Sequence, residues 1–226
     1  MTSVDDPTTL HRLLAAADTL LLDFDGPVCS VFAGSPAPVV ADQLRDILVE
    51  GGHVVPAQVK ASLDPFDVLH YAATLGPDEA RYAEAAFAAH EAEAITGAAP
   101  TPGAHELMSA WCGSNRPLFI VSNNSRTAID AYIDLHGLRS LVAGVSARED
   151  ARVDRLKPNP YLVDQALAGR ARDAAVFVGD SATDQQAAQA AHVPFIGFAN
   201  KPEKIDGLGA AMATSMRLLA EAVQRF

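Results

Sequence analysis

A short apolar run that ends in two aspartates, Leu20-Leu21-Leu22-Asp23-Phe24-Asp25-Gly26, constrains the fold of this chain more than any other feature. An apolar run of this length, closed by turn residues, is typical of a buried strand in a parallel sheet. In open sheets of this kind, ligands bind outside the carboxyl ends of the strands. Two carboxylates so close together repel each other unless a cation or a proton lies between them. The run therefore predicts a functional site, although an acidic cap on a strand would look the same in isolation.

Composition narrows the class of protein. The chain has 226 residues, of which 49% are hydrophobic and 6% aromatic, so we expect a sizeable core of aliphatic side chains. The net charge of −11 argues against a nucleic-acid partner, which needs a basic surface. No apolar run approaches the length of a membrane span, and the first residues lack a basic leader. We therefore expect no membrane partner, a cytoplasmic location, and reduced thiols at Cys29 and Cys112.

Strand and helix patterns alternate along most of the chain. Helices are expected at residues 7–17, 104–112 and 125–136, and strands at 19–24, 118–121, 141–145, 175–178, 194–197 and near Met212. Strands that alternate with helices form a parallel sheet with right-handed connections and helices on both faces. The pattern therefore predicts an α/β protein with a doubly wound parallel sheet.

Residues 31–100 interrupt this alternation. Helical patterns at residues 39–50, 65–75 and 77–96 follow one another with glycine and proline breaks between them, and no strand pattern intervenes. The α/β pattern resumes after the proline-rich segment 99–103. We therefore predict two domains: an α/β core made of residues 1–30 and 101–226, and a small helical domain inserted at residues 31–100.

Two further polar clusters accompany the expected elements. Ser122 and Asn123 close the strand at 118–121, and a hydroxyl followed by helix amides can bind an anion, although such residues also cap helices for structural reasons. Lys157 is followed by Pro158 and Pro160, ahead of an expected helix, and a lysine next to rigid prolines can present a fixed positive charge. Most lysines, however, simply lie in exposed loops.

A second acidic pair follows a later strand. Asp180 comes directly after Gly179, at the end of the strand expected at residues 175–178, and Asp184 lies four residues further on. The glycine permits close approach of the backbone to a ligand. The two aspartates would also complement the dipole of the following helix, so the pair by itself leaves both interpretations open.

Taken together, these clusters resemble the four motifs of the haloacid-dehalogenase-like hydrolase superfamily. The matching residues are, in order, Asp23-Phe24-Asp25-Gly26, Ser122-Asn123, Lys157-Pro158, and Gly179-Asp180-Ser181 with Asp184. The segments 102–107 and 193–197 are similar to those of its phosphoglycolate-phosphatase-like branch, which carries a helical cap where this chain has residues 31–100. Pro27 departs from the pattern, since many members have threonine there.

The resemblance implies a phosphatase that works through an aspartyl-phosphate. In that mechanism Asp23 is the nucleophile, and Asp25 first protonates the leaving oxygen and then accepts a proton from water. Mg²⁺ is the implied cofactor, since oxygen ligands suit this ion. The residues implied to hold it are Asp23, Asp25, Asp180 and Asp184.

The same resemblance implies the phosphate contacts and the partner. Ser122, Asn123 and Lys157 would bind the phosphoryl oxygens, and Lys157 would also stabilise their charge during the reaction. The substrate would be a small phosphorylated metabolite, and the protein a monomer or a homodimer. The basic cap residues considered as contacts for the leaving group are Arg45, His53, Lys60, His70 and Arg81, most of which we expect to be solvated.

Several alternatives use the same framework. A sugar-phosphate mutase of the same family would share the core residues, and inorganic phosphate release separates it from a phosphatase. A dehalogenase is disfavoured by Asp25, because halide leaves without protonation, and a phosphonate hydrolase would need a cap lysine, for which only Lys60 is present. A non-catalytic regulatory or interaction module could keep the fold, but would commonly have lost one of the motif residues.

Overall fold

Seven strands form one parallel sheet in the computed structural model, which describes residues 3–34, 36–199, 208–209 and 211–225. The strands are β1 (Ser3–Val4), β2 (Thr19–Leu22), β3 (Leu118–Ser125), β4 (Gly144–Arg148), β5 (Ala175–Gly179), β6 (Phe195–Phe198) and β7 (Ala211–Ala213). Their order across the sheet is β1-β7-β6-β5-β2-β3-β4. The strand order reverses at β2, which lies between β5 and β3. The predicted α/β class with a doubly wound parallel sheet is confirmed.

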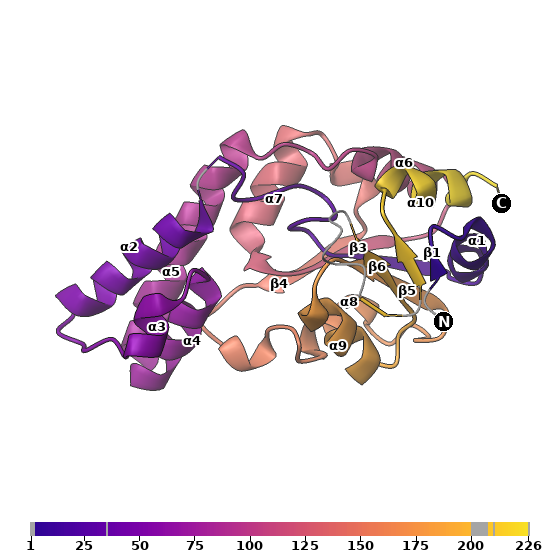
Figure 1. Ribbon diagram of the computed structural model, residues 1–226. Helices are drawn as coiled ribbons and strands as arrows, with labels where there is room; N and C mark the ends of the chain where they lie inside the picture. Colours follow the sequence, from indigo (N-terminus) through magenta and orange to yellow (C-terminus); the bar gives the residue numbers. More distant parts are fainter. Residues whose placement is uncertain (1–2, 35, 200–207, 210, 226) are drawn as a thin grey trace.

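Helices cover both faces of this sheet (Figure 1). The α-helices of the described residues are α1 (Pro7–Ala15), α2 (Ala37–Glu50), α3 (Ala57–Ala61), α4 (Pro65–Leu75), α5 (Pro77–Ala94), α6 (Ala104–Gly113), α7 (Arg126–Leu135), α8 (Tyr161–Leu167), α9 (Ala182–Ala190) and α10 (Met216–Val223). Short 3₁₀ turns lie at η1 (Ile95–Gly97), η2 (Arg139–Leu141) and η3 (Val153–Arg155). No helix of the described chain has the length and apolar character needed to cross a membrane.

Strand β2 shows why an unbroken apolar run forms the centre of the sheet. All four of its residues are buried, and successive side chains of a strand point to opposite faces. Leu20 and Leu22 pack with α1, α6, α7 and α10, whereas Leu21 packs with α8 and α9. Because each face of the sheet is covered by helices, each face needs an apolar side chain.

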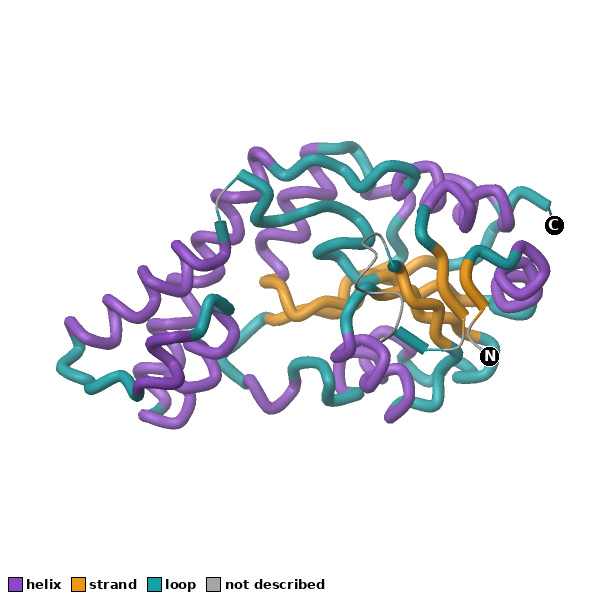
Figure 2. The backbone as a smooth tube through the Cα atoms, viewed as in Figure 1, coloured by secondary structure: helices purple, strands orange, loops and turns teal. Residues whose placement is uncertain are grey.

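Helices α2, α3, α4 and α5 extend away from the sheet (left in Figures 1 and 2). Helix α4 packs against both α2 and α5, and the apolar side chains between them continue into the cluster on the α8 and α9 face of the sheet. No strand lies among these helices in the described residues. The division of the chain at residues 31–100 stays a prediction.

Several element boundaries differ from those expected. Strand β1 and helices α3 and α10 were not expected, because elements of two to eight residues carry little periodic signal. Residues 139–141 form a 3₁₀ turn, so the strand expected at 141–145 begins at Gly144, where it pairs with Phe119. The strand expected at 118–121 continues to Ser125 as β3, but its register with β4 shifts after Val121. That irregularity lies at the polar segment that the sequence singled out.

Candidate active site

A cavity of about 340 Å³ lies at the carboxyl ends of β2, β3 and β5, where the strand order reverses. This is the position at which open α/β sheets bind ligands. The core residues that line it are Asp23, Asp25, Ser122, Asn123, Asn124, Lys157, Pro158, Asp180, Ser181 and Thr183. Six of the seven predicted site residues are in this set. The seventh, Asp184, is fully buried and contacts Lys157 beside the cavity.

Lys157 joins three of the four predicted motifs. Its Nζ atom donates hydrogen bonds to Asp23 Oδ1 at 2.7 Å and to the Val121 carbonyl at 3.1 Å, and it also donates to Asp184 Oδ1. The side chain is only 3% exposed, so the ammonium is removed from water. Since a buried charge is costly unless it is paired, these contacts hold Lys157 in one position at the floor of the cavity.

The charge around Asp23 is unbalanced. Burial, followed by the charge of Asp184, raises the pKa of Asp23 to about 8; Asp180 adds to the rise and Lys157 opposes it. Burial lowers the pKa of Lys157, but the charges of Asp184 and Asp23 outweigh this effect and raise it. One ammonium therefore serves two buried carboxylates with a third nearby, which leaves net negative charge at the site.

Asp184 is held by the start of helix α9. Its Oδ2 atom accepts hydrogen bonds from the backbone amides of Asp180 at 3.2 Å and Ser181 at 3.0 Å, and from Ser181 Oγ at 2.6 Å. Ser181 Oγ in turn accepts from the Asp184 amide at 3.2 Å. This reciprocal arrangement is a capping box, so Asp184 serves the helix terminus and also faces Lys157.

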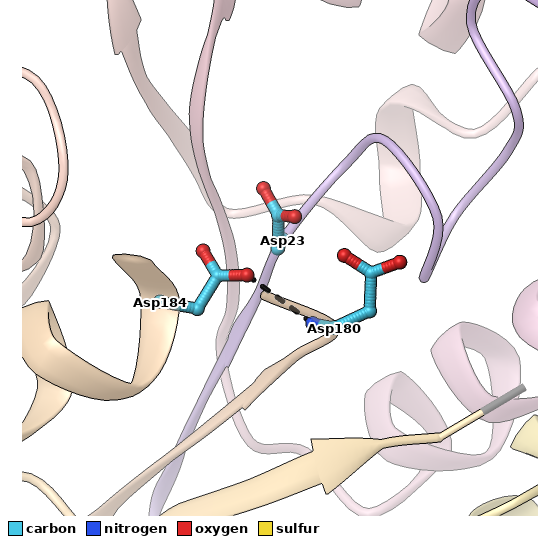
Figure 3. Close-up of side chains that lie close together, drawn as sticks. All are labelled: Asp23, Asp180 and Asp184. Atoms are coloured by element: carbon cyan, nitrogen blue, oxygen red, sulfur yellow. Dashed lines mark hydrogen bonds between the residues drawn. The ribbon is translucent and has the colours of Figure 1, made fainter. Parts of the chain in front are cut away.

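Three carboxylates converge in a way that suits a divalent cation. Oxygen atoms of Asp23, Asp180 and Asp184 all lie within 4.8 Å of one another (Figure 3). A cluster of oxygen donors with surplus negative charge is the chemistry that Mg²⁺ requires. Gly26 makes the approach of Asp180 possible, because a Cβ atom on it would lie 2.1 Å from Asp180 Oδ2. The residues present therefore fit a magnesium ion.

Asn123 clamps the polar end of β3 to the Lys157 loop. Its Nδ2 atom donates to the Lys157 carbonyl at 3.0 Å, and its Oδ1 atom accepts from the Lys157 amide at 2.8 Å. Next to it, Ser122 Oγ donates to Asn124 Oδ1 at 3.0 Å and accepts from the Asn124 amide at 3.3 Å. Ser122, Asn123 and Lys157 therefore lie together beside Asp23, in the arrangement expected of groups that share one ligand.

Asp25, two residues after Asp23, also lines the cavity. Its Oδ1 atom accepts a hydrogen bond from the Val31 amide at 2.9 Å, which fixes the start of the segment that leads to α2. Cys29 lies beneath this loop and is fully buried. Burial, with further contributions from Asp25 and Asp23, raises the pKa of its thiol, so Cys29 is a packing residue with little thiolate character.

Two buried charged residues behind the site were not predicted. Glu91 of α5 is fully buried and accepts hydrogen bonds from Asn124 Nδ2 and from the Ser125 amide, both at 2.9 Å. Arg148 donates to Glu91, to Glu84 at 2.6 Å, and to the Asn123 carbonyl at 3.1 Å. One signal was available: Glu91 falls on the buried stripe of α5, four residues after Phe87.

The side of the cavity formed by the helical segment α2 to α5, for which we keep the name cap, also differs from expectation. It is formed by Asp64, Phe66, Asp67 and His70, all at the start of α4. Of the five basic cap residues considered, only His70 lines it. Three of the others have partners elsewhere. Arg45 donates to Asp42 and to the carbonyls of Val59 and Ser62. His53 bonds to Glu79, Arg81 donates to Asp78, and Lys60 is exposed. Asp64 and Asp67 were not predicted, because only basic residues were expected to contact an anionic substrate.

Comparisons with known proteins agree with this architecture. A family profile described as haloacid dehalogenase-like hydrolase matches residues 67–198, which is more than half of the chain. The matched range contains Ser122, Lys157 and Asp180, whereas Asp23 and Asp25 precede it. A search of curated proteins gave no match.

Solved structures with the same fold cover nearly the whole chain. A predicted phosphoglycolate phosphatase from Haemophilus somnus is 17% identical, with a TM-score of 0.66, over 92% of this chain and 99% of that one. A haloacid dehalogenase family hydrolase from Deinococcus radiodurans, with bound phosphate and sodium, is 26% identical, with a TM-score of 0.56, over 92% and 97%. CbbY from Rhodobacter sphaeroides in complex with phosphate is 17% identical, with a TM-score of 0.62, over 89% and 95%. This chain belongs to the haloacid dehalogenase-like hydrolase family.

Proposed function

We propose that the protein is a Mg²⁺-dependent phosphatase that hydrolyses small phosphomonoesters through an aspartyl-phosphate on Asp23. The observation that carries the proposal is the buried contact of Lys157 with Asp23, beside the carboxylates of Asp180 and Asp184 and on the floor of a cavity. Structures of similar fold support it, since one is described as a predicted phosphoglycolate phosphatase and two contain phosphate.

In the first step, an Asp23 carboxylate oxygen attacks phosphorus and the ester oxygen leaves. Asp25, which lines the same cavity, gives that oxygen its proton. In the second step, Asp25 takes a proton from a water molecule, which attacks the phosphoryl group and releases inorganic phosphate and free Asp23. Splitting the hydrolysis in this way replaces one difficult step by two easier ones.

The other residues bind and orient the phosphoryl group. Ser122 and the Asn123 amide are proposed to donate hydrogen bonds to its oxygens, and the Lys157 ammonium to offset the charge that develops on them. Asp23, Asp180, the Asp25 carbonyl and Asp184 are the groups proposed to hold Mg²⁺, which when bound neutralises phosphoryl charge. Held in place by Asp184 and Val121, Lys157 needs no rearrangement to act.

The experiment that tests this proposal measures inorganic phosphate release from an aryl phosphate, with Mg²⁺ and with excess chelator. We expect release only with Mg²⁺, and a loss of at least about three orders of magnitude in Asp23→Asn, with the fold retained by circular dichroism. Asp154→Asn is the matched control, since Asp154 is exposed and bonds to Arg152 on the surface. Turnover by Asp23→Asn near the wild-type rate would contradict the assignment of the nucleophile.

A further inference from the structure

The cap wall of the active-site cavity is built from one short stretch of chain. Asp64, Phe66, Asp67 and His70 all come from the first turns of α4 and the residue that precedes it. They line the same cavity as Asp23 and Asp25. If the proposed function holds, the part of the substrate that departs with the ester oxygen therefore lies against these four side chains.

Internal hydrogen bonds hold this wall in place. Arg45, which is 9% exposed, donates to the carbonyls of Val59 at 3.1 Å and Ser62 at 2.7 Å, and so fixes the loop before α4. Ser62 Oγ donates to Asp67 Oδ2 at 2.5 Å and accepts from the Asp64 amide at 3.1 Å. The two carboxylates are therefore positioned by the cap before any ligand arrives.

Each of these carboxylates keeps an oxygen for a ligand. Asp64 Oδ1 caps α4 by accepting from the Phe66 amide at 2.9 Å, and Asp67 Oδ2 accepts from Ser62. Within the described chain, no protein group donates a hydrogen bond to Asp64 Oδ2 or to Asp67 Oδ1. Phe66 itself packs edge-on against Phe87, with ring centroids 5.0 Å apart. The wall thus offers hydrogen-bond acceptors beside a fixed aromatic ring.

The charges of the cavity oppose an anionic leaving group. Five aspartates line it, and Lys157 is the one lysine or arginine among its described lining residues. That ammonium is bound to Asp23 and Asp184, so it serves the phosphoryl end. His70 is the remaining lining residue that can become cationic, and it lies on α4 three residues after Asp67.

From this arrangement we infer the substrate class, an inference that rests on the proposed function. The substrate is a phosphomonoester of an uncharged or cationic alcohol, whose O–H or N–H groups donate to Asp64 and Asp67. Esters whose alcohol carries a carboxylate or a second phosphate are disfavoured, because that anion would meet the carboxylates of Asp64 and Asp67. Phosphoglycolate, whose leaving group carries a carboxylate, is therefore a poor substrate.

The test compares three esters of nearly equal size: hydroxyethyl phosphate, phosphoethanolamine and phosphoglycolate. They differ in the group at the far end, which is a hydroxyl, an ammonium or a carboxylate. We expect kcat/KM to be at least about tenfold higher for the hydroxyl or the ammonium ester than for phosphoglycolate, on the scale of one like-charge contact. A higher kcat/KM for hydroxyethyl phosphate would indicate a polyol substrate, and a higher value for phosphoethanolamine would indicate an amino-alcohol substrate.

Removing the charges of Asp64 and Asp67 tests whether these residues cause the preference against phosphoglycolate. In Asp64→Asn/Asp67→Asn, the preference over phosphoglycolate should fall about tenfold or more, because asparagine keeps the helix cap and the hydrogen bond but not the charge. Asp78→Asn is the matched control, since Asp78 lies on the same cap, is exposed and bonds to Arg81, and it should leave the preference unchanged.

The outcomes separate this inference from the proposed function. An enzyme that hydrolyses the aryl phosphate but takes phosphoglycolate as readily as the other two esters would overturn the inference alone. An unchanged preference in the double variant would overturn the role of Asp64 and Asp67. No release from any ester, the aryl phosphate included, would overturn the proposed function itself.

Discussion

At the scale of single residues, the position of Lys157 depends on two carboxylates from distant parts of the chain. Asp23 follows β2 and Asp184 lies in α9, and both bond to the same ammonium. Removing one member of a buried charged group leaves the others unpaired, which costs more than the interaction itself contributes. Lys157 therefore combines a stabilising role with its proposed role in phosphate binding, and the two can be separated by experiment.

Lys157→Met should reduce kcat/KM for an aryl phosphate by about two orders of magnitude or more. In the presence of chelator it should also lower the free energy of unfolding by about 3–5 kcal/mol, because Asp23 and Asp184 then face each other without a cation. Urea unfolding and phosphate release measure the two effects. Lys60→Met, at an exposed position of the cap, is the matched control and should change stability by less than about 0.5 kcal/mol.

A second substitution separates the loss of stability from the loss of activity. Adding Asp184→Asn to Lys157→Met removes one of the unpaired carboxylates, so part of the lost stability should return while activity stays low. If Asp184→Asn changes the free energy of unfolding equally in the wild type and in Lys157→Met, the two side chains do not interact, contrary to their contact.

At the scale of secondary-structure elements, α5 connects the cap to the strand that carries Ser122. The helix spans Pro77–Ala94, and its buried Glu91 bonds to Asn124 and Ser125 at the end of β3. Arg148 of β4 completes the contact and stacks over the Phe87 ring at 4.6 Å. Asn124 Oδ1 also accepts a hydrogen bond from the Ser122 hydroxyl. The position of α5 therefore affects the position of Ser122 in the proposed phosphate site.

Glu91→Gln should lower the free energy of unfolding by about 2–4 kcal/mol, because Arg148 loses a buried carboxylate partner. It should also raise KM for the aryl phosphate, since Asn124 and with it Ser122 lose their support. Glu93→Gln is the matched control, being an exposed residue on the same helix. If both variants unfold at the same urea concentration and share one KM, α5 does not support the site in this way.

At the scale of the whole molecule, the proposed metal site draws on segments that come together only in the folded chain. Asp23 lies after β2, and Asp180 and Asp184 lie after β5, at neighbouring strands of the sheet. The unfolded chain cannot reproduce this cluster, so a cation that binds it stabilises the folded state alone. The net charge of −11 adds general repulsion that any cation would screen.

Addition of Mg²⁺ should therefore raise the melting temperature, by several degrees at a concentration about 100-fold above its dissociation constant, where the gain is about 2.7 kcal/mol. Na⁺ at matched ionic strength controls for screening and should give a smaller rise. Asp180→Asn should lose most of the Mg²⁺-specific rise, whereas the exposed Asp154→Asn should keep it. An identical rise with both salts would mean that Mg²⁺ acts only by screening.

The local pattern of the sequence determined the parallel sheet, most of its helices, and the seven residues around the cavity. An apolar run such as Leu20–Leu22 must be buried on both faces, and polar residues that follow parallel strands meet at one edge, so both are encoded locally. Only the tertiary structure decided that Lys157 bridges Asp23 and Asp184, that Glu91 is buried against Arg148, and that Asp64 and Asp67 form the cap wall. The physical reason is that a charged side chain is buried or exposed according to partners far away in the sequence, which no local period records.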